Sequence, residues 1–242
     1  MLAVFIKEFS AFFSSLVAYI AIGAFLVMTG LFLWIFPESA ILDNGYATLD
    51  SLFAVVPYLF MFLIPAITMR SLAEEKKDGT FELLATRPLS DSQIIGGKFF
   101  ACLGVIVFTL MLTTVYYVTV RTLSVPAGEV DSGAIAGSYI GLVLLGASFI
   151  SIGIFASSIS KNQIVSFSLA VFLCFFSFSG FDSLSTLISL QTVDALVSSL
   201  GISEHYQSLG RGVVDSRDVL YFVSFSGLFL MLTKTVLGGR KW

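Results

Sequence analysis

The stretch RSLAEEKKDGTFELLATRPLSDSQIIGGK, residues Arg70 to Lys98, is the one long polar segment in a mostly apolar sequence. It carries five of the 13 lysines and arginines and five of the 16 acidic residues. Charged side chains are costly to place in lipid. The segment must therefore stand in water or against a water-soluble partner.

The segment reads as a helix, a break, a short helix, a second break and a further helix. Arg70–Lys77 continues the preceding apolar run as a charged helix end, and Asp78-Gly79-Thr80 stops it, because glycine accepts the left-handed conformation. Phe81–Thr86 then forms a short helix that Pro88 ends. Ser90-Asp91-Ser92-Gln93 fits a capping box, which opens the helix leading through Lys98 into the next apolar run.

The composition outside this segment is that of a membrane protein. Hydrophobic residues make up 57% of the 242 residues, charged residues make up 12%, and the mean hydropathy is +0.96. A water-soluble domain of this composition would expose apolar surface, so we expect an all-α integral membrane protein. The net charge of −3 argues against a nucleic-acid partner. Cys102 and Cys174 lie in apolar runs and are expected to pack there, forming neither a disulfide nor a metal site.

Six apolar runs are long enough to cross a bilayer, which needs about 20 residues. Met1–Phe13 is amphipathic and predicts a helix in the membrane interface, not a cleaved signal peptide. Pro57 and Pro65 predict a kink in the second span. Residues 182–218 have apolar residues at helical spacing, which predicts external helices between spans five and six. The six expected spans are about Ala11–Phe36, Leu52–Met69, Phe99–Val120, Ile135–Ile159, Ile164–Phe181 and Val219–Val236.

Basic residues are distributed unequally between the two sides that six spans define. An even number of spans puts both termini on one side, and positive charge favours the cytoplasmic side. The predicted topology therefore has cytoplasmic termini and a cytoplasmic Arg70–Lys98 segment. The termini side holds Lys7, Arg70, Lys76, Lys77, Arg87, Lys98, Lys161, Lys234, Arg240 and Lys241, whereas the other side holds Arg121, Arg211 and Arg217.

Two glycines in the fourth span predict close helix packing. Gly137 and Gly141 form a G-x-x-x-G pattern, and small residues let two helix backbones approach each other. The pattern is compatible with packing inside the chain and with a subunit interface.

No stretch of the sequence carries a complete catalytic, cofactor or metal motif. A phosphate-binding loop ending at Gly97-Lys98 requires glycine in place of Ser92 and serine or threonine in place of Phe99. A nucleophile elbow around Ser148 lacks the closing glycine, since Ile150 stands there. His205 is the single histidine and has no second ligand residue beside it. We therefore expect a non-catalytic protein without a cofactor or metal.

The polar segment resembles the cytoplasmic loop of ABC-2-type transporter permeases. RSLAEEKKDGTFELLATRPLS, followed by GGK, is similar to the loop whose short coupling helix docks on an ATP-hydrolysing subunit. The stretch HYQSLGRGVVDSRDVLYF, residues 205–222, resembles the gliding-motility-associated permeases of the GldF group of Bacteroidetes. Together the similarities cover nearly the whole chain and imply a single ABC-2-type transmembrane domain over residues 1–242.

The resemblance also implies partners and a docking site. The expected partners are a cytoplasmic ATPase of the GldA kind and a second permease subunit, either of the GldG kind or a second copy, in a bacterial inner membrane. Gly79 and Thr80 would form the turn into the coupling helix. The apolar contact would come from Phe81, Leu83 and Leu84, and the acidic contact from Glu74, Glu75 and Glu82.

Two other functions remain open from the sequence. A stand-alone channel or secondary transporter is disfavoured because the predicted spans have no ionisable residue well inside them. A non-transporting scaffold of a larger complex needs no such residue and is compatible with the sequence.

Overall fold

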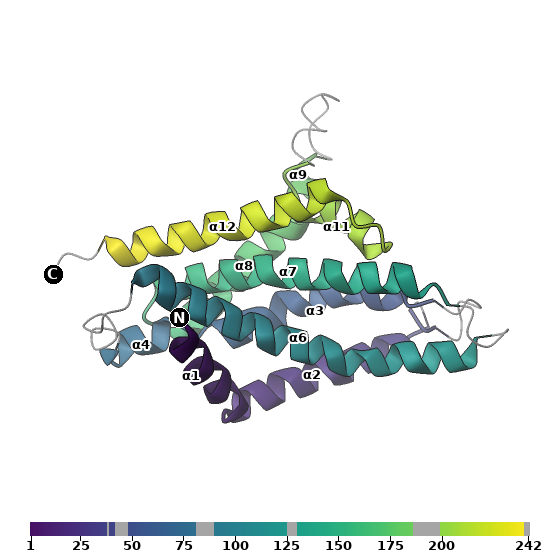
Figure 1. The fold of residues 1–242 in the computed structure, drawn as a ribbon, viewed down its shortest axis with the longest axis horizontal. Coiled ribbons are helices and arrows are strands. Elements are labelled where there is room, and N and C mark those ends of the chain that lie inside the picture. The colour runs from purple at the N-terminus through teal and green to yellow at the C-terminus, as the bar shows by residue number, and fades with distance from the viewer. Residues whose placement is uncertain (38, 42–47, 81–89, 125–129, 186–198, 240–242) are drawn as a thin grey trace.

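The computed structural model describes residues 1–37, 39–41, 48–80, 90–124, 130–185 and 199–239. Within these ranges the regular structure is helical, which confirms the all-α prediction (Figure 1). The elements are α1 (Leu2–Phe13), α2 (Leu16–Trp34), α3 (Asp50–Thr68), α4 (Ala73–Lys77), α6 (Asp91–Leu123), α7 (Ser132–Ile159), α8 (Gln163–Phe175), the π-helical η1 (Phe176–Gly180), α9 (Phe181–Ser185), α11 (Ile202–Gly210) and α12 (Ser216–Gly238).

Six of the described helical stretches are long and apolar enough to cross a membrane, as the sequence predicted. They contain α2, α3, α6, α7, α8 and α12, and α8 continues through η1 into α9 without leaving the helical path. The predicted coupling helix at Phe81–Thr86 and most of the predicted external segment, residues 186–198, lie outside the described residues.

Side-chain caps set where several of the helices begin. The predicted capping box is confirmed at α6, where Ser90 Oγ accepts from the Gln93 N–H and the Gln93 side chain accepts from the Ser90 N–H. Asp131, Asn162 and Asp215 cap α7, α8 and α12 in the same way. Each cap takes up N–H groups that the first turn of a helix leaves without a backbone partner.

Helix α1 ends at Phe13, as predicted, but the first span begins later than the apolar pattern predicts. The first apolar run is not one helix through Ala11–Phe36, because α1 ends at Phe13 and α2 starts at Leu16. The break is stabilised by hydroxyls, since Ser14 Oγ donates to the Ser10 carbonyl at 2.9 Å and the Tyr19 hydroxyl donates to the Phe13 carbonyl at 2.8 Å. The Tyr19 bond supplies a partner for a carbonyl that the end of the helix leaves open, whereas the Ser10 carbonyl also accepts from the Ser14 N–H.

The charged segment is also not a simple continuation of the second span. Helix α3 ends at Thr68, a turn occupies residues 69–72, and α4 starts at Ala73. The helical stretch Asp50–Lys77 confirms that Arg70–Lys77 continues the second span, but a turn that was not predicted interrupts it. The physical reason for the turn is the hydroxyl of Ser157 in α7, which takes over its hydrogen bonds.

Helix α3 stays helical through both of its prolines. Pro57 has no N–H to donate to the carbonyl four residues earlier, so the Phe53 carbonyl loses its helix partner. The Tyr206 hydroxyl of α11 donates to that carbonyl at 2.8 Å. Burial raises the pKa of the Tyr206 phenol, which keeps its proton available for this bond. A helix at one end of the bundle thus supplies the hydrogen bond that a proline in α3 removes.

Helix α7 is the most deeply buried of the six spans, and its glycines face close neighbours. A Cβ on Gly141 would lie 2.7 Å from Leu209 Cβ of α11, and one on Gly137 would overlap the carbonyl of Gly212. Gly212 itself has φ +84°, in the turn between α11 and α12. The G-x-x-x-G face therefore packs within this chain, against α11 and the turn that follows it.

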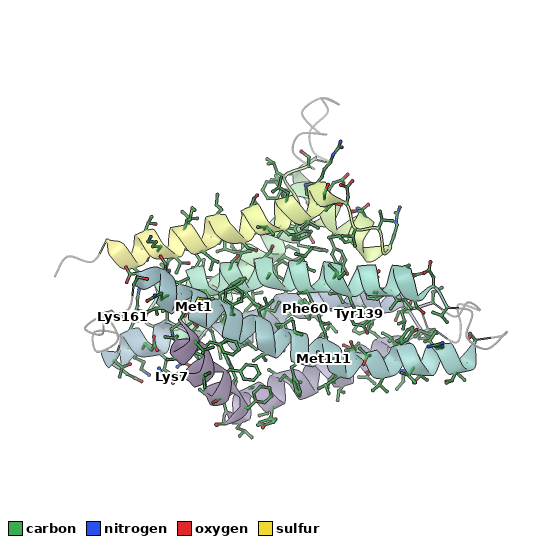
Figure 2. The ribbon with its side chains drawn as sticks, viewed as in Figure 1. Met1, Lys7, Phe60, Met111, Tyr139 and Lys161 are labelled. Carbon is green, nitrogen blue, oxygen red and sulfur yellow. The ribbon has the colours of Figure 1, made fainter. Side chains whose placement is uncertain are left out.

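The bundle has two chemically different ends. One end, here named the charged end, is formed by α1, α4, the start of α6, the turn between α7 and α8, and the end of α12 (Figure 1). Figure 2 shows Met1, Lys7 and Lys161 at this end, with Phe60 and Tyr139 farther along the bundle. The opposite end carries the end of α6 and the start of α7, with the turn between α11 and α12 packed against α7 (Figure 1).

We expect Gly137→Ala to destabilise the protein, because the added methyl group would overlap the Gly212 carbonyl. Overpacking of this kind typically costs about 1–3 kcal/mol. Gly227→Ala is the matched control, since a Cβ at Gly227 meets nothing within 4 Å. Thermal unfolding of both variants in detergent measures the difference. Equal melting temperatures would contradict the close approach of α7 and the Gly212 turn.

Candidate functional site

Lys98 lies at the centre of a charged cluster near the start of α6. Its side chain is 1% exposed, although it carries a full positive charge. Its ammonium donates to Glu8 Oε1 of α1 at 2.8 Å and to the Ser71 carbonyl at 2.7 Å, and it lies 2.9 Å from Glu75 Oε1 of α4. An ammonium group has three N–H donors. The three acceptors, which come from three different segments, match that number.

The cluster is electrically balanced. Glu8 and Glu75 are 14% and 12% exposed, and Lys7 approaches both from its solvent side at 3.6 Å and 3.3 Å. Two lysines therefore face two carboxylates. A buried ion pair is stable only when its charges are paired and hydrogen-bonded well enough to offset the loss of water. The cluster fixes α1, α4 and α6 to one another, because separating its charges would leave them unpaired in a poorly solvated place.

Glycine makes this arrangement possible. A Cβ on Gly97 would lie 2.8 Å from Val4 Cβ, so only glycine allows α1 to approach α6 this closely. The approach brings Glu8, one turn after Val4 along α1, to the Lys98 ammonium. Gly104 repeats the same contact farther along α6, where a Cβ would lie 3.0 Å from the Phe9 ring.

A second set of contacts joins α4 to α7. Ser157 Oγ accepts from the N–H groups of Leu72 and Ala73, both at 3.0 Å, and donates to the Met69 carbonyl at 3.1 Å. The Lys76 ammonium donates to the Ser158 carbonyl, one residue farther along α7. The turn between α3 and α4 is thus held by side-chain and backbone groups of the most buried helix.

The cluster joins the two stretches of chain that flank residues 81–89, and residues 81–89 themselves are outside the described residues. On one side, α4 ends at Lys77 and Gly79 turns the chain with φ +67°. On the other, the capping box at Ser90 opens α6. Glu75 of the first flanking segment and Lys98 of the second are in direct contact. Any force on residues 81–89 would therefore reach α1, α6 and α7 through a few short bonds.

The predicted site residues fall into three groups. Glu74, Gly79 and Thr80 lie at the charged end, and Thr80 Oγ1 donates to the Glu75 carbonyl at 3.4 Å. Glu75 is placed in the internal cluster, so its role in binding a partner stays a prediction. Phe81, Glu82, Leu83 and Leu84 are outside the described residues, and Gly137 and Gly141 lie toward the opposite end.

Sequence reasoning missed three residues that matter at this site. Lys98 was expected in a water-exposed loop, and Glu8 and Ser157 were given no role. The signals were weak but present: a Gly-Gly pair directly before Lys98, and a lysine and a glutamate side by side in an otherwise apolar amphipathic helix. Ser157 had no signal in the sequence, because its partners are backbone groups 84 to 88 positions away.

A smaller polar cluster lies at the opposite end. His205 Nδ1 lies 2.7 Å from Asp218 Oδ1, and its Nε2 lies 3.0 Å from the Ser199 carbonyl. Ser208 donates to the second oxygen of Asp218, and the His205 ring stacks on Tyr221 with 3.9 Å between centroids. Within the described ranges, no group of three His, Cys, Asp or Glu residues is placed to hold a metal ion. The contacts fix α11 against α12.

Six apolar spans, an ion-paired charged end and helices packed through glycines define a multi-pass helical membrane protein. The chain belongs to the ABC-2 family of transporter proteins, because the model of the ABC-2 family transporter protein matches residues 35–201. That region includes α3, α4 and the start of α6, so it covers most of the charged end. The predicted ABC-2 class is thus confirmed.

Two curated relatives carry the same description, a probable multidrug ABC transporter permease, YbhR, from Escherichia coli strain K12 and from Escherichia coli O157:H7. Each is 30% identical over 122 residues, which is 50% of this chain and 31% of the relative. The matched part of this chain thus spans about a third of the length of these relatives. The closer resemblance to gliding-motility permeases stays a prediction.

We expect Lys98→Met to destabilise the protein strongly, because it leaves Glu8 and Glu75 as buried carboxylates with Lys7 alone to balance them. Removing one partner of a buried ion pair typically costs about 3–5 kcal/mol. Lys7→Met is the matched control and should cost less than about 1 kcal/mol, since Lys7 is 61% exposed. Unfolding in detergent measures both.

A compensating variant separates lost charge balance from lost packing. Lys98→Met combined with Glu8→Gln and Glu75→Gln removes all three buried charges and should recover much of the stability. If Lys98→Met unfolds no more easily than Lys7→Met, the buried cluster does not hold the charged end together.

Proposed function

We propose that this chain is the membrane-spanning permease subunit of an ABC transporter and that it hydrolyses nothing itself. A separate ATPase subunit would supply the energy, and the chain would convert it into export or into mechanical work across the membrane. Membership of the ABC-2 family supports this proposal, as do the curated relatives described as ABC transporter permeases.

The observation that carries the proposal is the direct contact between Glu75 and Lys98 at 2.9 Å. It ties together the two segments that flank residues 81–89, the place where the coupling helix is expected. The two segments that flank residues 81–89, α4 and the start of α6, are here called the two supports. A docking helix transmits force only if both supports are fixed to the spans that must move. Here the first support is bonded to α7 through Ser157 and meets α1 at Lys7, and the second support meets α1 at Glu8.

In the proposed mechanism, closure of the ATPase displaces residues 81–89 and moves both supports as one unit. The displacement reaches α7 through the Ser157 hydrogen bonds, α6 through Lys98 and α1 through Glu8. Phe81, Leu83 and Leu84 would provide the apolar docking contact. Glu82 would face a basic group on the ATPase, whereas Glu74 lines a cavity beside α4 and Glu75 would link the two supports.

The membrane arrangement is part of the same proposal. The charged end would face the cytoplasm of a bacterium, with both termini on that side of the inner membrane. The excess of basic residues at this end supports that orientation. A complete transporter would need a second permease half, either a GldG-like chain or a second copy, together with a GldA-like ATPase. The proposed process is gliding motility or the secretion associated with it.

Cysteine labelling from each side of the membrane tests the orientation. Thr80→Cys should react with a membrane-impermeant maleimide only when the cytoplasmic face is open, and Val213→Cys, which is 61% exposed at the opposite end, should react only from outside. The native thiols give a low background, because Cys102 and Cys174 are both buried. Labelling of Thr80→Cys from the periplasmic side would overturn the proposed function.

Two substitutions test the coupling role. Leu84→Asp places a charge in the expected apolar contact. Gly79→Pro removes the left-handed turn, since proline holds φ near −65° and Gly79 has +67°. Either variant should insert normally and should reduce ATP turnover by the complex to that of the ATPase alone.

The matched control for Leu84→Asp is Leu200→Asp, an exposed leucine at the opposite end. It should leave stimulated ATP turnover within about twofold of the unmodified complex, because exposed substitutions rarely disturb a fold. Copurification with the ATPase should be lost in Leu84→Asp and kept in Leu200→Asp. An unchanged ATPase response in both would favour a scaffold or an independent channel.

A further inference from the structure

A cavity of about 250 Å³ opens beside the charged cluster. Its walls come from α1, the start of α2, the end of α3, the turn at residues 69–72 and α4. The part that lies between the spans is apolar and is lined by Phe12, Val17, Ala21 and Ile67. The part next to α4 is charged. The cavity thus has an apolar part between the spans and a charged part next to α4.

Three buried polar atoms at the charged part have no hydrogen-bond partner within the described residues. They are Arg70 Nε, Ser71 Oγ and Glu75 Oε2, and all three residues line the cavity. Ser71 is only 5% exposed. Native proteins leave few buried polar atoms unpaired, because each one gives up its hydrogen bonds to water without replacement. Three together in one cavity indicate a bound molecule.

The unpaired atoms specify the chemistry of that molecule. Arg70 Nε is a donor and calls for an anionic acceptor, whereas Glu75 Oε2 is an acceptor and calls for an N–H or O–H donor. Glu74 also lines the cavity, and its carboxylate has no ion pair within the described part of the chain. A ligand with both an anionic oxygen and an ammonium N–H matches these groups, and the apolar walls match a hydrocarbon chain.

Water alone fits the cavity poorly. At roughly 30 Å³ each, about eight water molecules would fill it, and a buried water needs two to four polar partners. In the apolar half, Ser15 offers a single hydroxyl, and the side chains of Phe12, Val17, Ala21 and Ile67 offer no polar group. An amphiphile instead places its chain against Phe12 and Ile67 and its headgroup against α4.

We propose that this cavity binds a phospholipid whose headgroup joins a phosphate to a primary ammonium, as in phosphatidylethanolamine. The phosphate accepts from Arg70, and the ammonium donates to Glu75 Oε2 and to Glu74. Phosphatidylcholine carries the same charges, but its trimethylammonium group has no N–H to donate. The site goes beyond the proposed coupling function, since it requires neither ATP nor a partner subunit.

Native mass spectrometry of the full chain in detergent tests the site. Dioleoyl-phosphatidylethanolamine and dioleoyl-phosphatidylcholine are added in equal amounts, and the fraction of protein retaining each lipid is measured. We expect retention of the ethanolamine lipid to be at least about tenfold greater, as the loss of a hydrogen bond to a charged group predicts. Equal retention of the two lipids overturns the proposal.

Variants locate the binding to this cavity. Arg70→Gln and Glu74→Gln should each lower retention of the ethanolamine lipid about tenfold. Arg217→Gln is the control, an exposed arginine at the opposite end, and should change nothing. Ala21→Phe fills the apolar part and should abolish retention. Melting temperatures within about 2 °C of the unmodified chain would show that the variants are folded. Normal retention by folded Arg70→Gln and Glu74→Gln overturns the proposal.

Single-charge and soluble probes identify which part of the ligand matters. Dodecylamine and dodecyl phosphate each supply one charge and a chain, and we expect both to be retained less than the ethanolamine lipid. Free phosphoethanolamine supplies the headgroup alone and should not displace the lipid at equimolar concentration. Displacement by free phosphoethanolamine would assign the site to a soluble metabolite, and retention of dodecylamine equal to that of the lipid would make the phosphate irrelevant. Either result overturns the proposal.

Discussion

The charged end of this protein depends on one buried ammonium group. Lys98 is withdrawn from water almost completely and is tolerated only because α1, the α3–α4 turn and α4 each bring it an oxygen acceptor. Movement of α1 or α4 would take a carboxylate away from this ammonium, and movement of the turn would take away a hydrogen-bond acceptor, in a poorly solvated place. The three segments are therefore held in a fixed relation.

Hydroxyl groups have a comparable role in the spans. At three places where the described helices lose backbone hydrogen bonds, a side chain supplies a partner. Ser157 does so for the turn after α3, Tyr206 for the carbonyl left by Pro57, and Tyr19 for the Phe13 carbonyl at the end of α1. In apolar surroundings an unpaired backbone group is costly. Each such bond consequently fixes the position of one helix along its neighbour.

Much of the fold could be predicted from the sequence, because it depends on local properties. Hydropathy located all six spans, and the capping box at Ser90 and the turn at Gly79 followed from residues within a few positions of one another. The break at residues 69–72 could not be predicted, since nothing within the Arg70–Lys77 sequence disfavours a helix. It is stabilised by Ser157, a residue of a helix that the local sequence does not reveal.

The candidate site was predictable only in part for the same reason. The sequence marked the region between α3 and α6 as polar and as the place for a partner to dock. It did not show that Lys98 would be buried, because burial of a lysine depends on Glu8, 90 positions away. Glu75 looked like a surface charge for a partner when considered alone, and only the three-dimensional arrangement places it in an internal ion pair.

The distance in sequence between Glu8 and Lys98 also sets an order of events during synthesis. Helix α1 leaves the ribosome 90 residues before the lysine that fixes it in place, so it must wait at the membrane without its partner. Leu2 and Ile6 of α1 have exposed fractions of 71% and 54% in the folded protein. This apolar side of α1 is suited to contact with lipid before α6 has been made. Insertion of α6 then completes the ion cluster, when both acidic partners of Lys98 have already been made.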